Sequence, residues 1–173
     1  SAIAKAAAIN KSSALTGVVA TVIGTTASGQ YQGASALTSG TDQLSVTING
    51  VTTGNVISAG NQGTDRANMV SAINLISKQT GVSAVDTGGN GTGIQLVAND
   101  GRNITLAVGT ATAGGTLAAF GLGAAGVYTG TFALTSTTSS PITISTTNSG
   151  TLSNAGLTAG SYSANTTFVS TVF

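Results

Sequence analysis

Four aspartates, Asp42, Asp65, Asp86 and Asp100, are the residues of this 173-residue chain whose chemistry could support catalysis or ion binding. A pair of carboxylates can act on a glycoside as acid and base. Histidine, cysteine and glutamate do not occur, so the usual general bases, thiol nucleophiles and zinc ligands are missing. The aspartates are separated from one another by 14 or more residues. We therefore predict that the chain is not an enzyme and has no catalytic, cofactor or metal site.

Local sequence suggests a structural role for three of these acids. Asp65 stands where a carboxylate would cap a helix, while Asp86 and Asp100 stand in turns. A calcium turn at residues 100–103 is the alternative, but one acid supplies too few oxygen ligands and a hairpin turn explains all four residues. The glycine-rich run at residues 88–91 lacks the lysine and helix that follow in a phosphate cradle, so we interpret it as a turn.

Three tyrosines, Tyr31, Tyr128 and Tyr162, occur at repeated positions of the chain. Exposed together, they would offer a surface on which glycan rings stack. Alternatively they cover the core, which is thin because aromatic residues are only 4% of the chain. We favour the covering role and keep glycan binding as the alternative.

Composition argues against several classes of partner. The net charge is +1, and no basic patch with interleaved aromatic residues is available for nucleic acid. No apolar run approaches the roughly 20 residues that span a bilayer, and no cationic amphipathic helix would bind a membrane surface. The lack of cysteine fits a secreted bacterial protein. We expect neither a nucleic acid nor a membrane as partner.

The central stretch of the chain predicts a strand followed by a helix. Residues 44–50 alternate apolar and polar side chains and end in Asn-Gly, which predicts a half-buried strand and a tight turn. From Asp65 the period becomes helical, with Thr64 or Asp65 as the cap and Gly81 at the end. The predicted buried face of this helix carries Met69, Ala72, Ile73 and Ile76.

Three further strands follow this helix in the sequence. Residues 82–85 and 94–98 have strand patterns and are separated by the glycine-rich turn, and a second turn precedes residues 103–108. We predict that these strands form a small meander.

The start of the chain repeats part of the central stretch. Residues 8–20 are identical to residues 72–84 at eight positions, which predicts a first helix over residues 1–15. The second helix is preceded by a strand that the first copy lacks. We expect the missing strand upstream of residue 1.

The repeat also predicts equivalent environments in the two helices. Ile9 and Ile73 should both be buried, and Gly17 and Gly81 should both end their helices, because the same local sequence meets the same kind of sheet face.

The second half of the chain echoes the first. Residues 31–39 match residues 128–136 at six of nine positions, and residues 116–128 resemble residues 151–162. We predict mostly short strands here, with helical turns near residues 117 and 152. Pro141 should lie at the start of a strand or on an edge.

The whole pattern predicts an α+β fold. We expect it to be β-rich, with small antiparallel sheets, two short helices packed on them, and two related subdomains. The predicted domains are residues 1–108 and 109–173, with the boundary near residues 109–115.

The motifs "TINGV", "AINLISKQTGVSA" and "GIQLVANDGRNITL" together resemble a repeat of the variable central region of bacterial flagellins. In that repeat a strand ending in Ile-Asn-Gly precedes a helix carrying Ala-Ile-Asn and Thr-Gly-Val. The long helices that form the core of a flagellin filament are absent from this sequence. The resemblance implies a surface-exposed outer domain, secreted to the bacterial flagellum, with neighbouring flagellin subunits of a homopolymeric filament as partners.

Three functions follow from these patterns. The first is a structural role in the filament surface, in motility and antigenicity. The second is an extracellular adhesin or glycan-binding module that recognises a host or glycan surface. The third, an enzyme carried on a filament, is disfavoured by the missing catalytic residue types.

Overall fold

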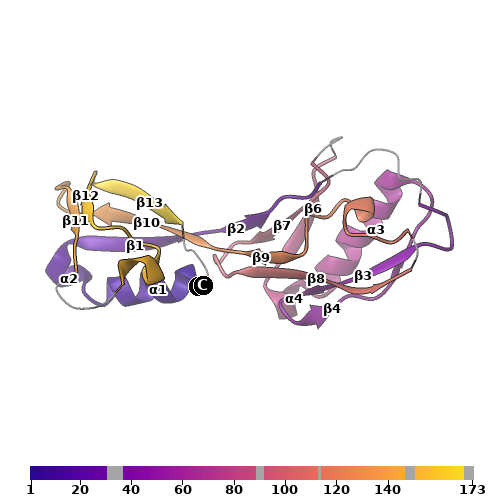
Figure 1. Cartoon of the computed structure of the whole chain (residues 1–173), viewed down its shortest axis with the longest axis horizontal. Coiled ribbons are helices and arrows are strands. Elements are labelled where there is room, and N and C mark those ends of the chain that lie inside the picture. Colours follow the sequence, from indigo (N-terminus) through magenta and orange to yellow (C-terminus); the bar gives the residue numbers. More distant parts are fainter. Residues whose placement is uncertain (31–36, 89–91, 113, 147–150, 170–173) are drawn as a thin grey trace. The chain divides into compact units, whose positions relative to one another are not determined.

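A computed structural model describes residues 1–30, 37–88, 92–112, 114–146 and 151–169 (Figure 1). The fold is α+β with mostly small antiparallel sheets and few helices, as the sequence predicts. The described helices are α1 (Ala2–Asn10), α2 (Ser13–Thr16), α3 (Gln62–Leu75), α4 (Ser77–Thr80) and the 3-10 helices η1 (Ala118–Phe120) and η2 (Leu152–Ala155). None of the described helices is long and apolar enough to cross a membrane.

The described strands follow in chain order as β1 (Val18–Ile23), β2 (Thr25–Ala27), β3 (Gln43–Ile48), β4 (Val51–Thr52), β5 (Val56–Ile57), β6 (Ser83–Asp86), β7 (Ile94–Ala98), β8 (Ile104–Ala111), β9 (Gly126–Tyr128), β10 (Thr131–Ser136), β11 (Ile142–Ile144), β12 (Gly160–Tyr162) and β13 (Asn165–Val169). Each predicted helix is therefore one longer helix followed by a separate helical turn, α1 with α2 and α3 with α4.

Contacts divide the chain into two compact units that are each built from separate stretches of sequence. Unit 1 is Ser1–Thr25, Asn99–Asn103 and Thr129–Phe173, and unit 2 is Thr26–Ala98 and Ile104–Tyr128. This grouping differs from the predicted division at residue 108. The physical reason is that β1, near the start of the chain, pairs antiparallel with β10, more than a hundred residues later.

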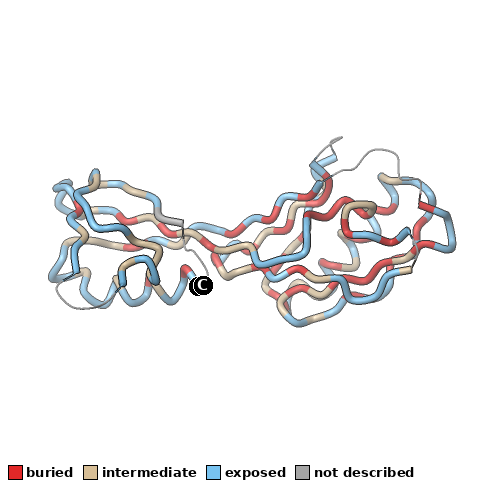
Figure 2. The backbone as a smooth tube through the Cα atoms, viewed as in Figure 1, coloured by how far each residue is buried: buried red, intermediate tan, exposed pale blue. Residues whose placement is uncertain are grey.

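Unit 2 contains a sheet with the order β4-β3-β8-β9, in which β5 also pairs with β3, and a second sheet with the order β2-β7-β6. Helix α3 contacts β5 and β6. Buried and less buried positions alternate along β7 (Figure 2). The largest fully buried side chains of this core are Leu44, Val46, Ile48, Met69, Ile73, Ile94, Leu96, Ile104, Leu106, Phe120 and Leu122.

The hairpin of β3 and β4 confirms the predicted strand and turn. Ile48 pairs with Val51, and Asn49 and Gly50 between them have φ angles of 48° and 86°. Positive φ at both central residues is the mark of a type I′ turn, which Asn-Gly favours. The strand is more buried than predicted, since Ser45 is only 1% exposed.

The second helix begins earlier than predicted and has a different cap. Helix α3 starts at Gln62, and Oδ1 of Asn61 accepts a hydrogen bond of 3.1 Å from the amide of Thr64. Thr64 and Asp65 lie inside the first turn, so neither is the cap that the sequence suggested. An asparagine before the helix satisfies the free amide equally well.

The predicted inner face of the second helix is confirmed in its centre. Met69 and Ile73 are both 0% exposed, whereas Ala72 and Ile76 are only partly buried. Gly81 follows α4 in the left-handed conformation, with a φ of 71°, which confirms the predicted end.

The predicted meander is confirmed in its first two strands only. Strands β6 and β7 pair antiparallel, with Ser83 opposite Val97. The third strand, β8, pairs with β3 and β9 and not with β7. Residues 99–103 belong to unit 1, so the chain leaves unit 2 between β7 and β8 and no hairpin joins these strands.

Unit 1 contains a sheet with the order β1-β10-β13 and a two-stranded sheet of β11 and β12. Helix α1 packs on β1. Pro141 comes directly before β11, which confirms its predicted place at the start of a strand. The buried core consists of Ala2, Ala6, Ala20, Phe132, Leu134 and Ile142.

The repeated helices share hydrogen bonds as well as sequence. Asn74 donates through Nδ2 to the carbonyl of Ala84 at 3.0 Å and accepts the Ala84 amide at 2.8 Å. Asn10 makes the same two bonds with Ala20, at 2.9 and 2.7 Å. The side-chain amide therefore fastens each helix to the strand that follows it.

The two predictions drawn from the repeat have different outcomes. Gly17 ends the first helical segment with a φ of 66°, as Gly81 ends the second, so this prediction is confirmed. Ile73 is fully buried, but Ile9 is only partly buried against its core. The prediction that both isoleucines are buried is wrong for Ile9.

The similarity between residues 116–128 and residues 151–162 is also a similarity of structure. The 3-10 helices η1 and η2, near the predicted positions, end at Gly121 and Gly156 with φ angles of 83° and 71°. The hydroxyl of Tyr128 donates to Ala124 O at 2.7 Å, and that of Tyr162 donates to Thr158 O at 2.7 Å. Residues 31–36, part of the other echo, lie outside the described residues.

The strands of the two units correspond in the same order. Strand β7 pairs with β6 as β10 pairs with β1. Strand β8 pairs with β9 through Ile104 and Tyr128, and β11 pairs with β12 through Ile142 and Tyr162. Thus α3, α4, β6, β7, β8, η1 and β9 of unit 2 have counterparts in α1, α2, β1, β10, β11, η2 and β12 of unit 1.

Candidate functional site

Asp42 is a buried link between two segments that are distant in sequence. Its Oδ2 accepts the amide of Thr38 at 2.7 Å, and its Oδ1 accepts the amide of Gly114 at 2.9 Å. These main-chain hydrogen bonds hold the pKa of Asp42 below its ordinary value, and the bond from Thr38 has a larger effect than the bond from Gly114. The carboxylate therefore joins the segment before β3 to the one after β8.

Asp65 is buried in the first turn of α3. Its carboxylate accepts the hydroxyl of Ser58 at 2.8 Å and the amide of Ala59 at 2.6 Å. It fastens the segment after β5 to the helix, which is a structural role of a different kind from the predicted cap.

Asp86 is the last residue of β6, opposite Ile94, so it lies at the end of a strand and not in the turn that the sequence predicts for it. Its Oδ1 accepts the amide of Gly88 at 2.9 Å. It also forms a partly buried ion pair with Arg66 of α3, with 2.9 Å between Nε and Oδ1. Burial acts to raise the pKa of Asp86, but the Gly88 amide and Arg66 outweigh it, so the pKa lies below its ordinary value. Residues 89–91 of this turn lie outside the described residues.

Asp100 occupies the other predicted turn. It pairs with Arg102 at 2.7 Å and accepts the Arg102 amide at 3.1 Å. The Arg102 side chain lowers the pKa of Asp100 in spite of partial burial. Oδ1 of Asn103 accepts the amide of Gly130 at 3.2 Å. In the described part of the chain, no three acidic, histidine or cysteine residues gather in a way that would hold a metal ion.

The tyrosines take part in packing. Tyr128 packs against the core of unit 2 and Tyr162 against that of unit 1, and both are partly buried. Their hydroxyl groups donate to nearby main-chain carbonyls, as described above. Tyr31, the third member of the glycan-stacking alternative, lies outside the described residues.

Asn49 has a role beyond its turn. Its Nδ2 donates to Thr80 O at 3.1 Å, and its Oδ1 accepts the amide of Thr105 at 2.8 Å. Its own amide donates to Thr105 O at 3.1 Å. One side chain thus joins the end of α4 to β8. The sequence predicts Asn49 only as a turn residue, although its place in the Ile-Asn-Gly motif is a signal of this further role.

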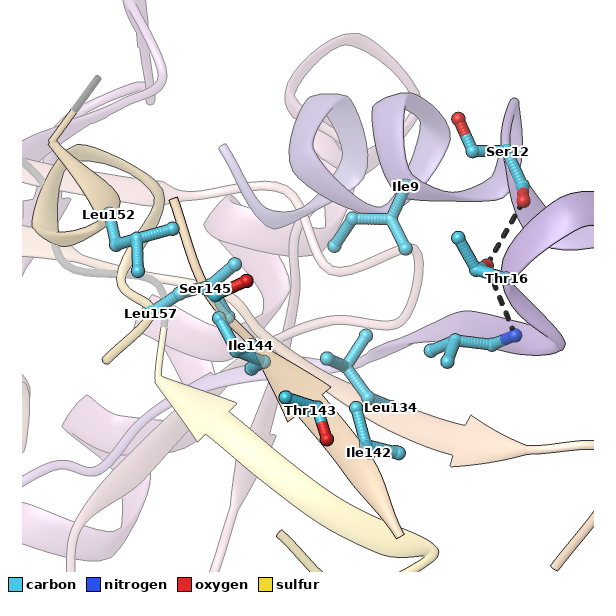
Figure 3. Close-up of a pocket in the computed structure, with 11 residues that line it drawn as sticks. Ile9, Ser12, Thr16, Leu134, Ile142, Thr143, Ile144, Ser145, Leu152 and Leu157 are labelled. Carbon is cyan, nitrogen blue, oxygen red and sulfur yellow. Dashed lines mark hydrogen bonds between the residues drawn. The ribbon is translucent and has the colours of Figure 1, made fainter. Parts of the chain in front are cut away.

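An apolar groove of about 340 Å³ lies in unit 1 between α1, β10, β11 and η2 (Figure 3). Ile9, Leu134, Ile144 and Leu157 lie around the opening, together with hydroxyl side chains such as Thr16. No acidic or basic side chain is among its lining residues. The groove is suited to hold apolar side chains, and it offers no group for acid-base or nucleophilic chemistry.

The sequence did not reveal this groove. It forms because β10 and β11 come from the far end of the chain and meet α1 only in the folded unit. No known family model matches the chain, and no curated protein matches it significantly.

Proposed function

We propose that the chain is a structural protein, the surface-exposed outer domain of a flagellin subunit in a bacterial flagellar filament. The observation that carries this proposal is the role of the Ile-Asn-Gly motif: Asn49 links the end of the helix to the sheet through Thr80 and Thr105. The motif on which the flagellin resemblance depends is therefore a structural element of the fold. Hydrogen bonds that join the helix to the sheet fit a domain whose role is structural.

The use of charge in the molecule supports a structural role. Asp42, Asp65, Asp86 and Asp100 each accept hydrogen bonds from main-chain amides, a hydroxyl group or an arginine. Among the described residues, the ion pair of Arg66 with Asp86 lies in unit 2 and that of Arg102 with Asp100 lies in unit 1. In this proposal the domain is secreted, contributes to the antigenic surface of the filament and lies beside the outer domains of neighbouring subunits.

Electron microscopy of the purified chain and of cells that lack this region in the parent protein would test the proposal. Filament growth needs long helices that bundle, and α3, the longest described helix, has only 14 residues. We expect no filaments from the purified chain, and filaments with an altered surface from the deletion strain. Antibodies against the chain should label wild-type filaments only.

Two results would contradict this proposal. One is the failure of the deletion strain to assemble filaments, which would place these residues in the polymer core. The other is an absence of antibody labelling on wild-type filaments. Binding of the purified chain to a glycan array would instead favour an extracellular adhesin.

A further inference from the structure

The groove of unit 1 has a filled counterpart in unit 2. Ile73, Val82, Leu106 and Leu122 are between 0% and 1% exposed. At the corresponding positions of unit 1, Ile9, Val18, Ile144 and Leu157 are only partly buried. The two sets share local structure, so the difference in burial comes from what covers them.

Strand β3 covers this region in unit 2. Its Leu44, Val46 and Ile48 are all 0% exposed and belong to the same core cluster as the four sealed residues. β3 pairs with β8, with Ile48 opposite Leu106 and Val46 opposite Val108. Among the described residues, β11, the counterpart of β8, pairs with β12 alone. The edge of β11 that would face a third strand thus borders the apolar groove.

Polar groups for such a strand are also in place. Asn49 uses the carbonyl of Thr80 and both main-chain groups of Thr105. The counterparts are Thr16 at the end of α2 and Thr143 of β11, and both line the groove. Thr143 lies opposite Ser161 as Thr105 lies opposite Val127. By this register, the amide and carbonyl of Thr143 face away from β12.

We propose that unit 1 is completed by one more β-strand, which pairs antiparallel with β11 and fills the groove with apolar side chains at alternate positions. We expect the sequence of this strand to resemble that of β3, with apolar residues at alternate positions and a final Asn-Gly. Its asparagine would bind Thr16 and Thr143. In unit 2 this strand precedes its helix in the chain, and the repeat assigns the occupant of unit 1 the same place, ahead of α1. An open edge beside an apolar groove is suited to a strand, since main-chain hydrogen bonds and alternate side chains are satisfied together. This strand site stands whether or not the domain belongs to a filament.

The first test adds a synthetic peptide with the sequence of residues 43–53 to the whole isotopically labelled chain. We expect hydrogen exchange of the Thr143 amide to slow by about tenfold or more, because it would gain a partner. A control peptide with aspartate in place of Val46 and Ile48 should bind about tenfold more weakly or worse. Protection of unit 2 amides with no change at Thr143 would overturn the proposal.

Two variants of the chain locate the site. Thr143→Pro removes the amide that the strand would bind, but this amide faces away from β12, so the fold should persist while peptide binding is lost. Ile144→Thr keeps a β-branched residue and makes the groove polar, so it should also weaken peptide binding. This second variant tests the site if the proline variant does not fold. Unchanged peptide affinity in a folded variant would overturn the site.

The second test supplies the strand on the same chain. Residue 65 corresponds to residue 1 in the repeat, so a copy of residues 43–64 placed directly before Ser1 reproduces the order of unit 2. We expect protection of Thr143 and a higher unfolding temperature than in a version whose copy carries the two aspartates. Equal protection in both versions, or protection of Thr143 by dimerisation of the unaltered chain, would overturn the proposal.

Discussion

Ile9 and Ile73 occupy the same position of two repeated helices, yet only Ile73 is sealed from solvent. Each isoleucine follows an alanine and precedes an asparagine. Ile73 lies in the cluster that contains β3, whereas Ile9 lines the open groove of unit 1. The burial of a repeated residue is therefore set by the neighbouring strand and not by its own helix.

The first prediction compares these two residues. Ile73→Ala should lower the free energy of unfolding by about 2 to 5 kcal/mol, because it leaves a cavity in a closed core. Ile9→Ala should cost clearly less, since water already reaches this side chain. Denaturant titration of both variants measures the difference. Leu75→Ala is the control, because Leu75 is 84% exposed. Equal losses for Ile9 and Ile73 would contradict the difference in burial.

The second prediction concerns the asparagine that fastens helix to strand. Asn74→Ala removes both bonds to Ala84 and leaves a main-chain amide and carbonyl without that partner, so we expect a loss of about 1 to 3 kcal/mol. Asn68→Ala on the exposed side of the same helix should be neutral or slightly stabilising, because alanine is the better helix former. Thermal unfolding of the two variants would separate these outcomes. Similar melting temperatures would show that the Asn74 bonds contribute little.

Local features of this fold could be predicted from the sequence. The Asn-Gly turn after β3 and the glycines that end α2 and α4 follow from backbone preferences of a few residues. The centre of the α3 inner face follows from the helical period, and it was correct for Met69 and Ile73.

Long-range features could not be predicted in this way. Strand β1 pairs with β10, and β8 pairs with β3, because each buries its side chains there, and no local pattern records the partner. The predicted cap of α3 is wrong for a related reason, because the carboxylate of Asp65 binds Ser58 and Ala59 of the preceding segment. The groove depends on several such pairings at once.

A third prediction separates backbone strain from hydrogen bonding at Asn49. Its φ of 48° is unfavourable for alanine, and its side chain links Thr80 to Thr105. Asn49→Gly tolerates the angle but lacks the amide, so it should lose about 1 to 3 kcal/mol through the missing bonds. Asn49→Ala should lose more, because the strained angle adds to this cost. Chemical denaturation would rank the variants, and a glycine variant as stable as wild type would show that the link is unimportant.

The last prediction concerns acid. The pKa of Asp86 is lower in the folded chain than its ordinary value, so its ionised form stabilises the fold above the unfolded pKa of about 3.9. This contribution is lost as pH falls through the lower folded pKa. We expect the free energy of unfolding to fall between pH 5 and pH 3 by less in Asp86→Asn than in wild type. The difference should be on the order of 0.5 kcal/mol, because the pair with Arg66 is partly exposed.

Arg66→Gln should reduce the same acid dependence, since the charge and hydrogen bond of Arg66 help to lower the pKa of Asp86. Lys78→Gln removes a positive charge from an exposed site in α4 and serves as the control. Its dependence on pH should match that of wild type, which distinguishes the local pair from a general effect of net charge. If Lys78→Gln and Arg66→Gln respond to acid alike, the ion pair is not the cause.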